Sequence, residues 1–135
     1  MSVLPERPLV LVVEDDRDVR LLFAMWLRDA GFRVETAHNG RQALDRAIEV
    51  LPDAVLTDLH IPGIDGYELT RRLRNDSRTA PIPILAVTGY GPFTQDPSRA
   101  ERAGCDAILP KPFAAEDLEH TLTTLIAKAR ERRSA

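Results

Sequence analysis

The chain has 135 residues, of which 44% are apolar and 29% are charged, a composition typical of a single soluble globular domain. Its net charge of −3 gives no indication of nucleic-acid binding or of attachment to a membrane surface. Because Cys105 is the only cysteine, we expect no disulfide and no thiolate metal site. No apolar run approaches the ~20 residues that a membrane helix needs, so we expect a cytoplasmic protein.

Residues 1–8 hold two prolines and one glutamate rather than a cationic start followed by a long apolar core. This composition predicts a short N-terminal tail and not a signal peptide. One domain is expected over residues 9–132, followed by a C-terminal tail over residues 133–135. The sequence contains no internal repeat and no linker to a second domain.

The first predicted strand, Leu9–Val13, is continuously apolar and rich in β-branched residues, the pattern of a strand buried on both faces. It ends at Glu14-Asp15-Asp16, and either Asp16 or Asp18 can cap the helix that follows. Ala30-Gly31 ends this helix. At 100° per residue, its core face is expected to hold Val19, Leu22, Phe23, Trp26 and Leu27.

Two apolar residues of this helix, Leu21 and Met25, fall roughly opposite its core face. Single apolar residues on a surface are common and need no function. A docking patch for a helix of a partner protein is the alternative interpretation. Trp26 is expected to lie away from any site at the edge of the sheet.

The second predicted strand, Arg33–Ala37, alternates between polar and apolar residues and is short, which predicts an edge strand. Asn39-Gly40 opens the next helix and Pro52 closes it. The apolar face of this helix is expected to hold Ala43, Leu44, Ala47, Ile48 and Leu51. The third strand, Ala54–Asp58, is apolar up to a single carboxylate, and turn residues follow it at once.

The second half of the chain continues the alternation. A helix is expected over residues 66–74, and a proline-rich loop leads from it to the apolar strand Ile84–Thr88. Pro97 limits the next helix to about residues 98–103, and a fifth strand is expected over residues 107–109. The last helix is predicted over residues 115–132, with an inward face of Leu118, Leu122, Leu125, Ile126 and Ala129.

Five strands that alternate with five helices predict an α/β fold. The sheet should be parallel and doubly wound, because each crossover between parallel strands is right-handed and carries a helix. In such a sheet the carboxyl ends of the strands meet at one crevice. The residues expected there are Glu14, Asp15, Asp58, Thr88 and Lys111.

These residue types point to one kind of chemistry. Three packed carboxylates repel one another unless a cation lies between them, and oxygen ligands without His or Cys suit a hard ion such as Mg²⁺. A divalent ion, an ammonium group and a hydroxyl around one carboxylate are what a phosphoryl group on that carboxylate would require.

This arrangement resembles the receiver domain of bacterial response regulators, and the resemblance covers nearly the whole chain. It depends on four motifs in the right order, each at the end of a predicted strand: Glu14-Asp15, Asp58 with Pro62-Gly63 and Asp65-Gly66 behind it, Thr88-Gly89, and Lys111-Pro112-Phe113. The resemblance implies a flavodoxin-like (βα)5 fold and a phosphorylation-dependent switch of a two-component system or phosphorelay.

The resemblance also implies roles for single residues. Asp58 is expected to accept a phosphoryl group from a sensor histidine kinase or a histidine phosphotransfer protein. Asp15 is expected to ligate Mg²⁺, or Mn²⁺ in its place, directly, and Glu14 through water. The main-chain carbonyl of His60 completes the protein's ligands, while the carboxylate of Asp58 also faces the ion.

Two further roles follow from the same resemblance. Thr88 is expected to supply the hydroxyl that moves onto the phosphoryl oxygen, and Lys111 to pair first with the carboxylate and then with the phosphoryl group. The bond between Lys111 and Pro112 is expected to be cis. His60 and Tyr90 flank the site at positions that tune the lifetime of the acyl phosphate, and Tyr90 can screen the attacking water.

Three residues depart from the family pattern. Glu14 stands where Asp is commoner, and its longer side chain can shift the water shell of the ion. Ile108 occupies the place of an aromatic residue that swings inward after phosphorylation. Without a Tyr or Phe there, Thr88 must be coupled in another way to the output face, which the predicted fourth helix, fifth strand and last helix form, and the docking contacts of that face are left open. Ala114 replaces the usual cap of the last helix, which forgoes ~1 kcal/mol.

Three other functions are alternatives to a phosphorylation-dependent switch. Asp16-Arg17-Asp18 has the letters of an Asp-nucleophile phosphohydrolase but lies beyond the end of the strand. A flavodoxin-like cofactor module shares the fold, yet the acidic loop after the first strand would repel a flavin phosphate. A receiver fold that serves only as an unphosphorylated interaction platform is the third alternative.

We therefore expect a signalling domain and not an enzyme. It is expected to be either a stand-alone single-domain regulator or a receiver isolated from a larger protein. Its expected partners are the phosphodonor and a downstream protein target, with no direct contact to nucleic acid or membrane. A monomer or a weak homodimer is expected.

Overall fold

The computed structural model describes residues 7–89 and 97–134. Five parallel strands form one sheet in the order β2-β1-β3-β4-β5, which confirms the predicted α/β class. A parallel order with a reversal at β1 is the doubly wound pattern. The strands are β1 (Leu9–Val13), β2 (Arg33–Ala37), β3 (Ala54–Asp58), β4 (Ile84–Thr88) and β5 (Ala107–Pro110).

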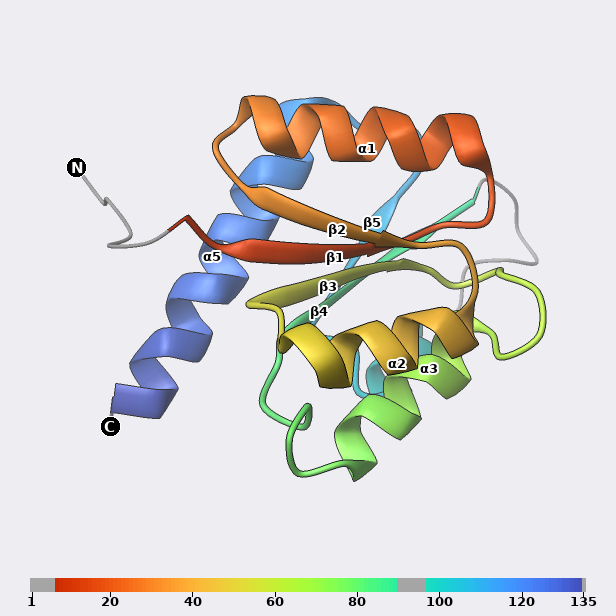
Figure 1. Ribbon diagram of the computed structural model, residues 1–135, viewed down its shortest axis with the longest axis vertical. Coiled ribbons are helices and arrows are strands. Elements are labelled where there is room, and N and C mark those ends of the chain that lie inside the picture. The colour runs from red at the N-terminus through yellow and green to blue at the C-terminus, as the bar shows by residue number, and fades with distance from the viewer. Residues whose placement is uncertain (1–6, 90–96, 135) are drawn as a thin grey trace.

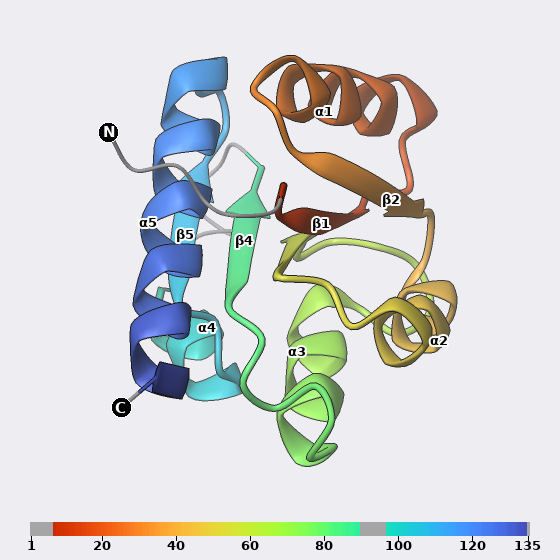
Figure 2. The ribbon, with the colours of Figure 1, turned by 60° about the vertical axis from the view of Figure 1, so that its left-hand side comes forward.

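The helices lie on both faces of the sheet (Figures 1 and 2). One face is covered by α1 and α5, and the other by α2, α3 and α4. The last helix continues two residues beyond its predicted end, up to Ser134. The helices are α1 (Arg17–Asp29), α2 (Gly40–Val50), α3 (Gly66–Asn75), α4 (Pro97–Ala103) and α5 (Ala115–Ser134).

Side-chain caps fix where three of the helices begin. The side-chain oxygens of Asp16, Asn39 and Asp65 each accept a hydrogen bond from a backbone amide three residues later, at 3.1, 2.8 and 2.9 Å. Each bond satisfies an amide that has no partner within its helix. Asp16, and not Asp18, therefore caps α1. At α5 the carboxylate of Asp117 accepts a bond from the amide of Ala114 at 3.0 Å, which replaces part of the missing cap.

The core has two layers because neighbouring residues of a strand point to opposite faces. In β1, Val10 and Val12 join the cluster under α1 and α5, while Leu11 and Val13 join the cluster under α2, α3 and α4. All four are at most 1% exposed. Burial on both faces explains why the sequence of β1 is continuously apolar instead of alternating.

Two residues that were predicted to face the core do not. Leu22 is 38% exposed and Leu51 is 52% exposed. Leu51 follows α2 as its C-cap with a left-handed φ of 46°, so it no longer follows the helical arc. In α1 the buried arc is centred on Phe23, Ala24 and Leu27, which turns Leu22 toward solvent. In the part of the chain that the structure describes, no helix has both the length and the apolar character needed to cross a membrane.

Candidate functional site

The predicted site residues lie at the carboxyl ends of four neighbouring strands. Asp58 is the last residue of β3 and pairs with Val87 in β4. Thr88, the next residue of β4, pairs with Pro110 at the end of β5, and its carbonyl accepts a hydrogen bond of 2.8 Å from the amide of Lys111. The sheet register therefore brings Asp58, Thr88 and Lys111 together although up to 53 residues separate them.

The carboxylate of Asp58 has a partner for each oxygen. Its Oδ2 accepts a hydrogen bond from Lys111 Nζ at 2.9 Å, and its Oδ1 accepts one from the amide of His60 at 2.8 Å. Lys111 Nζ also donates to Glu14 Oε1 at 3.1 Å. The exposed fractions of Asp58 and Glu14 are 7% and 2%, so one ammonium group serves two buried carboxylates.

The group of Asp58, Glu14 and Lys111 carries more negative than positive charge when both carboxyl groups are ionised. Burial, and then the repulsion of Asp58, raises the pKa of Glu14 to about 7, although Lys111 acts to lower it. For Lys111, burial lowers the pKa, but its hydrogen bonds and attraction to Asp58 and Glu14 outweigh burial, and the pKa is raised. Lys111 is therefore charged at neutral pH, and a single ammonium does not fully offset the two carboxylates.

The other predicted residues lie around this group. Thr88 is 3% exposed and donates a long hydrogen bond of 3.5 Å to the carbonyl of Gly89. Asp15, next to Glu14 beyond the end of β1, is exposed, whereas Glu14 and Asp58 are buried. The peptide bond between Lys111 and Pro112 is cis, as predicted, and Tyr90 lies outside the described residues.

Within the described residues, no group of three His, Cys, Asp or Glu side chains is arranged to hold a metal ion. The donor set nevertheless suits a hard cation. Glu14 and Asp58 provide buried carboxylate oxygens that are short of positive charge, and Asp15 adds an exposed carboxylate next to Glu14. Oxygen ligands with excess negative charge at an open rim are what Mg²⁺ binds while it keeps part of its water shell.

Sequence reasoning missed Arg20. Its guanidinium donates to the main-chain carbonyls of Glu14 at 2.9 Å and Asp15 at 3.4 Å, which ties the acidic loop to α1. A single arginine on an amphipathic helix gives no signal of this role in the sequence. The contact becomes visible only once the direction of α1 relative to β1 is known.

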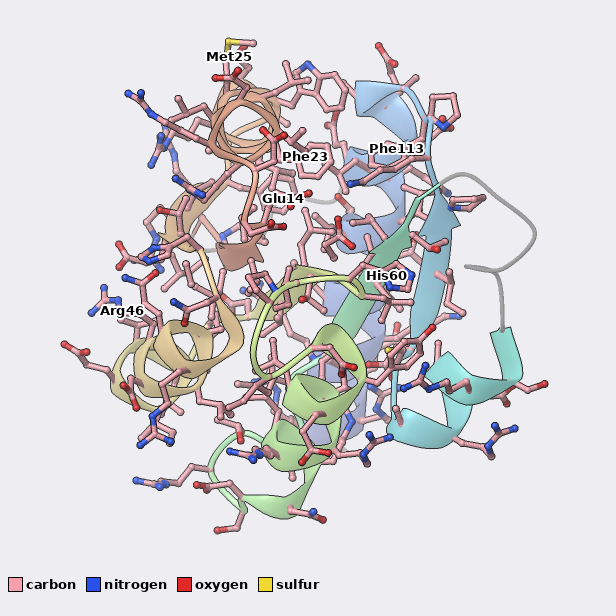
Figure 3. All side chains as sticks on the ribbon, turned by 90° about the vertical axis from the view of Figure 1, so that its right-hand side faces the viewer. Glu14, Phe23, Met25, Arg46, His60 and Phe113 are labelled. Atoms are coloured by element: carbon pink, nitrogen blue, oxygen red, sulfur yellow. The ribbon has the colours of Figure 1, made fainter. Side chains whose placement is uncertain are left out.

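Trp26 belongs to a cluster of three aromatic rings. Its ring is 5.9 Å from that of Phe23 and 6.4 Å from that of Phe113, and Phe23 and Phe113 stack at 5.6 Å. Phe113 is two residues beyond Lys111, whose Nζ lies 5.8 Å from the centre of the Phe23 ring. Figure 3 shows Phe23 and Phe113 side by side, with Glu14 near them.

The family model for the response regulator receiver domain matches residues 10–123. The chain belongs to this family. It is therefore a receiver domain of two-component signalling. The Asp58–Lys111–Glu14 group lies at the carboxyl edge of its sheet, and the flavodoxin-like architecture agrees with the family's solved structures.

Individual relatives agree with this assignment. The response regulator Rre1 of Synechocystis sp. is 36% identical over 120 residues, which are 88% of this chain and 52% of that protein. This receiver domain thus spans about half the length of the curated relatives it matches. The chemotaxis response regulator CheY4 of Vibrio cholerae has a TM-score of 0.81 and 32% identity, over 88% of this chain and 98% of its own.

A third relative bears on the metal. The receiver domain of the sensor histidine kinase PA1611 from Pseudomonas aeruginosa has a TM-score of 0.83 and 31% identity, over 90% of this chain and 98% of its own. Its structure holds a magnesium ion coordinated in the active-site cleft. Receiver domains of this fold thus include one with magnesium in the cleft.

We expect Glu14→Gln to stabilise the metal-free receiver domain above neutral pH. The pKa of Glu14 rises from 4.5 to about 7 on folding, so the folded state binds more protons between these values and loses stability as pH rises. Ionised Glu14 at about pH 8 then costs about 3 kcal/mol, and the neutral amide avoids this cost. Thermal unfolding without divalent ions at about pH 8 and pH 5 tests this expectation, and an equal gain in Tm at both values would contradict it.

Proposed function

We propose that phosphorylation of Asp58 switches this receiver domain. The observation that carries the proposal is the setting of the carboxylate, which is nearly buried and holds Lys111 Nζ at 2.9 Å and the His60 amide at 2.8 Å. An ammonium and a backbone amide directed at one carboxylate can stabilise the negative charge that a phosphoryl group brings.

The phosphoryl donor is the phosphohistidine of a sensor histidine kinase or of a histidine phosphotransfer protein. In the transfer, an oxygen of Asp58 bonds to phosphorus as the phosphorus–nitrogen bond breaks, and the imidazole nitrogen regains a proton from solvent. The switch resets when a water oxygen attacks phosphorus, the phosphorus–oxygen bond to Asp58 breaks, and orthophosphate leaves.

A divalent ion, Mg²⁺ or Mn²⁺, belongs to this proposal. Asp15 would hold it directly, Glu14 through water, and Asp58 and the main-chain carbonyl of His60 would complete the protein ligands. When bound, the ion neutralises charge on the phosphoryl oxygens. The shortage of positive charge around Glu14 and Asp58 supports this assignment.

Two side chains respond to the new group. The hydroxyl of Thr88 turns from the carbonyl of Gly89 toward a phosphoryl oxygen, and Lys111 moves its charge from the two carboxylates to the phosphoryl group. His60, two residues after Asp58 in the sequence, and Tyr90, two residues after Thr88, set how fast water removes the phosphoryl group. These roles rest on the family resemblance and on the positions of Thr88, Lys111 and His60 around Asp58.

Docking is assigned to three apolar residues. Leu21 and Met25 are each 51% exposed on α1, and their spacing of four residues places them on one side of the helix, where a partner helix can cover them. Ile108 is half-buried against the cluster under α2, α3 and α4, and we assign it to the output face.

The rival functions have less support. Asp16, the first carboxylate of the phosphohydrolase-like motif, caps α1 through its side chain and is committed to that contact. A purely structural platform would not need Lys111 between two buried carboxylates. We therefore infer a cytoplasmic signalling domain that is not an enzyme, whether it acts alone or within a longer protein, as a monomer or weak homodimer without direct nucleic-acid contact.

Intact mass spectrometry after incubation with Mg²⁺ and acetyl phosphate tests the proposal. We expect one phosphoryl adduct on the wild-type domain, none on Asp58→Asn, and none when EDTA removes the metal. The amide introduced by this substitution has nearly the same shape as the carboxylate but is not a nucleophile, so the fold is retained. The switch would be refuted if the wild type formed no adduct with acetyl phosphate and also none with a phosphorylated histidine phosphotransfer protein. An unphosphorylated interaction platform would then be the remaining interpretation.

A further inference from the structure

The ring of Tyr67 connects helix α4 with the loop that follows Asp58. Tyr67 lies in the first turn of α3 and is only 2% exposed. The imidazole ring of His60 meets it edge to face, with the ring centres 6.4 Å apart and the planes at 73°. The guanidinium carbon of Arg99, on α4, lies 3.7 Å from the centre of the same ring. One buried aromatic ring thus contacts both elements.

The position of Arg99 over this ring has a physical basis. The face of an aromatic ring is electron-rich and attracts a guanidinium group, more strongly where the ring excludes water. Arg99 also lies 3.9 Å from Oδ2 of Asp65, whose Oδ1 caps α3. Both contacts draw α4 toward the start of α3, although Arg99 itself is exposed.

The contacts continue to the phosphoacceptor through His60. The amide of His60 donates the 2.8 Å hydrogen bond to Asp58 Oδ1, and its ring rests on Tyr67. In Figure 3, His60 lies on the α4 side of the site and Glu14 on the α1 side. His60 therefore contacts Tyr67 through its ring and the reacting carboxylate through its amide.

We propose that Arg99 is a positioning residue for the phosphoacceptor, which it holds in place through Tyr67 and His60. The proposal rests on the proposed phosphorylation of Asp58. While Arg99 covers Tyr67, His60 is held against the site and limits the approach of water to the acyl phosphate. A protein that binds α4 and displaces Arg99 then shortens the lifetime of the phosphorylated state. This contact gives α4 a route to the site in a chain with Ile108 at the usual aromatic position.

The experiment measures the loss of the phosphoryl group from Asp58 over time. Each purified variant is phosphorylated with acetyl phosphate and Mg²⁺, freed of the donor, and followed by intact mass. Arg99→Met removes the cation and keeps most of the side-chain volume, and we expect its loss rate to rise at least about threefold. Arg99→Lys keeps a cation that can lie over the ring and should restore a rate near that of the wild type.

Arg102→Met is the matched control. Arg102 is an exposed arginine of the same helix, so its replacement changes the charge of α4 equally without a change at Tyr67. We expect this variant to keep the wild-type rate, and all variants to unfold at similar temperatures. An unchanged rate in Arg99→Met, or an equal rise in Arg102→Met, would overturn the positioning role while the adduct itself still supports the switch. No adduct on the wild type, from acetyl phosphate and also from a phosphorylated histidine phosphotransfer protein, would overturn both.

Discussion

Replacement of Arg74 by methionine is expected to lower the free energy of unfolding by about 3 kcal/mol, because it breaks a partly buried network of charge-assisted hydrogen bonds. The guanidinium donates to the carbonyls of Ala80 at 2.7 Å and Ile82 at 2.6 Å, and twice to the carbonyl of Gly104, at 3.0 and 2.8 Å. It also bonds Asp106 Oδ2 at 2.7 Å. One side chain of α3 thus holds the loop before β4 and the turn before β5.

Methionine fills the space of the arginine stem but supplies no donor, so at least three carbonyls lose their guanidinium partner. Urea unfolding of Arg74→Met measures the loss, with Arg72→Met as the matched control. In the described part of the chain, Arg72 pairs only with Glu68 on the surface of the same helix, and such exposed pairs contribute about 0.5 kcal/mol or less. Equal effects of the two substitutions would show that the Arg74 network adds nothing beyond a surface ion pair.

Gly66→Ala is expected to disturb both stability and the phosphoacceptor. A Cβ atom at Gly66 would clash with the carbonyl oxygen of Asp58 and would lie 2.6 Å from Cα of Leu59. Both neighbours are backbone atoms and cannot rotate away, so the start of α3 must move off the end of β3. We expect a loss of about 2 kcal/mol in unfolding free energy and a fall of at least about tenfold in the rate of phosphorylation from acetyl phosphate.

Gly89→Ala is the control for this substitution. Among the described residues, no atom lies within 4 Å of a Cβ at Gly89, and the backbone of Gly89 is not in the left-handed region, so the unfolding free energy of this variant should change by about 0.5 kcal/mol or less. Thermal unfolding of both variants, with the rate of adduct formation for Gly66→Ala, tests the expectation. Wild-type stability and rate in Gly66→Ala would mean that α3 does not pack against the phosphoacceptor loop as the structure has it.

Much of the fold could be predicted because burial on both faces marks the strands β1, β3 and β4. The runs Leu9–Val13, Ala54–Asp58 and Ile84–Thr88 were predicted at their observed bounds, since few other structures bury such short apolar runs completely. The helix faces were less certain. Leu22 and Leu51 were misplaced because angular spacing gives the direction of an apolar arc, but the neighbouring elements decide which edge of the arc they cover.

Some features of the site could likewise be predicted from the sequence and others could not. The positions of Asp58, Thr88 and Lys111 followed from the rule that the ends of parallel strands meet at one edge. The exposure of Asp15 and the shared ammonium between Glu14 and Asp58 did not follow, because they depend on side-chain directions after the strand ends. The contact of Trp26 with Phe113 did not follow either, since it joins α1 to the loop after β5.

The sequence by itself determined the class of the fold, the order of its elements and the residues that gather at the sheet edge, because periodicity and strand ends are local properties. Tertiary structure alone decided the contacts between distant side chains. Arg74 reaches Asp106 and Arg99 reaches Tyr67, each across 32 positions of the chain. Such pairs form only after the sheet register and the helix packing have set the distances between the side chains, and the pattern of residues along the chain does not specify those distances.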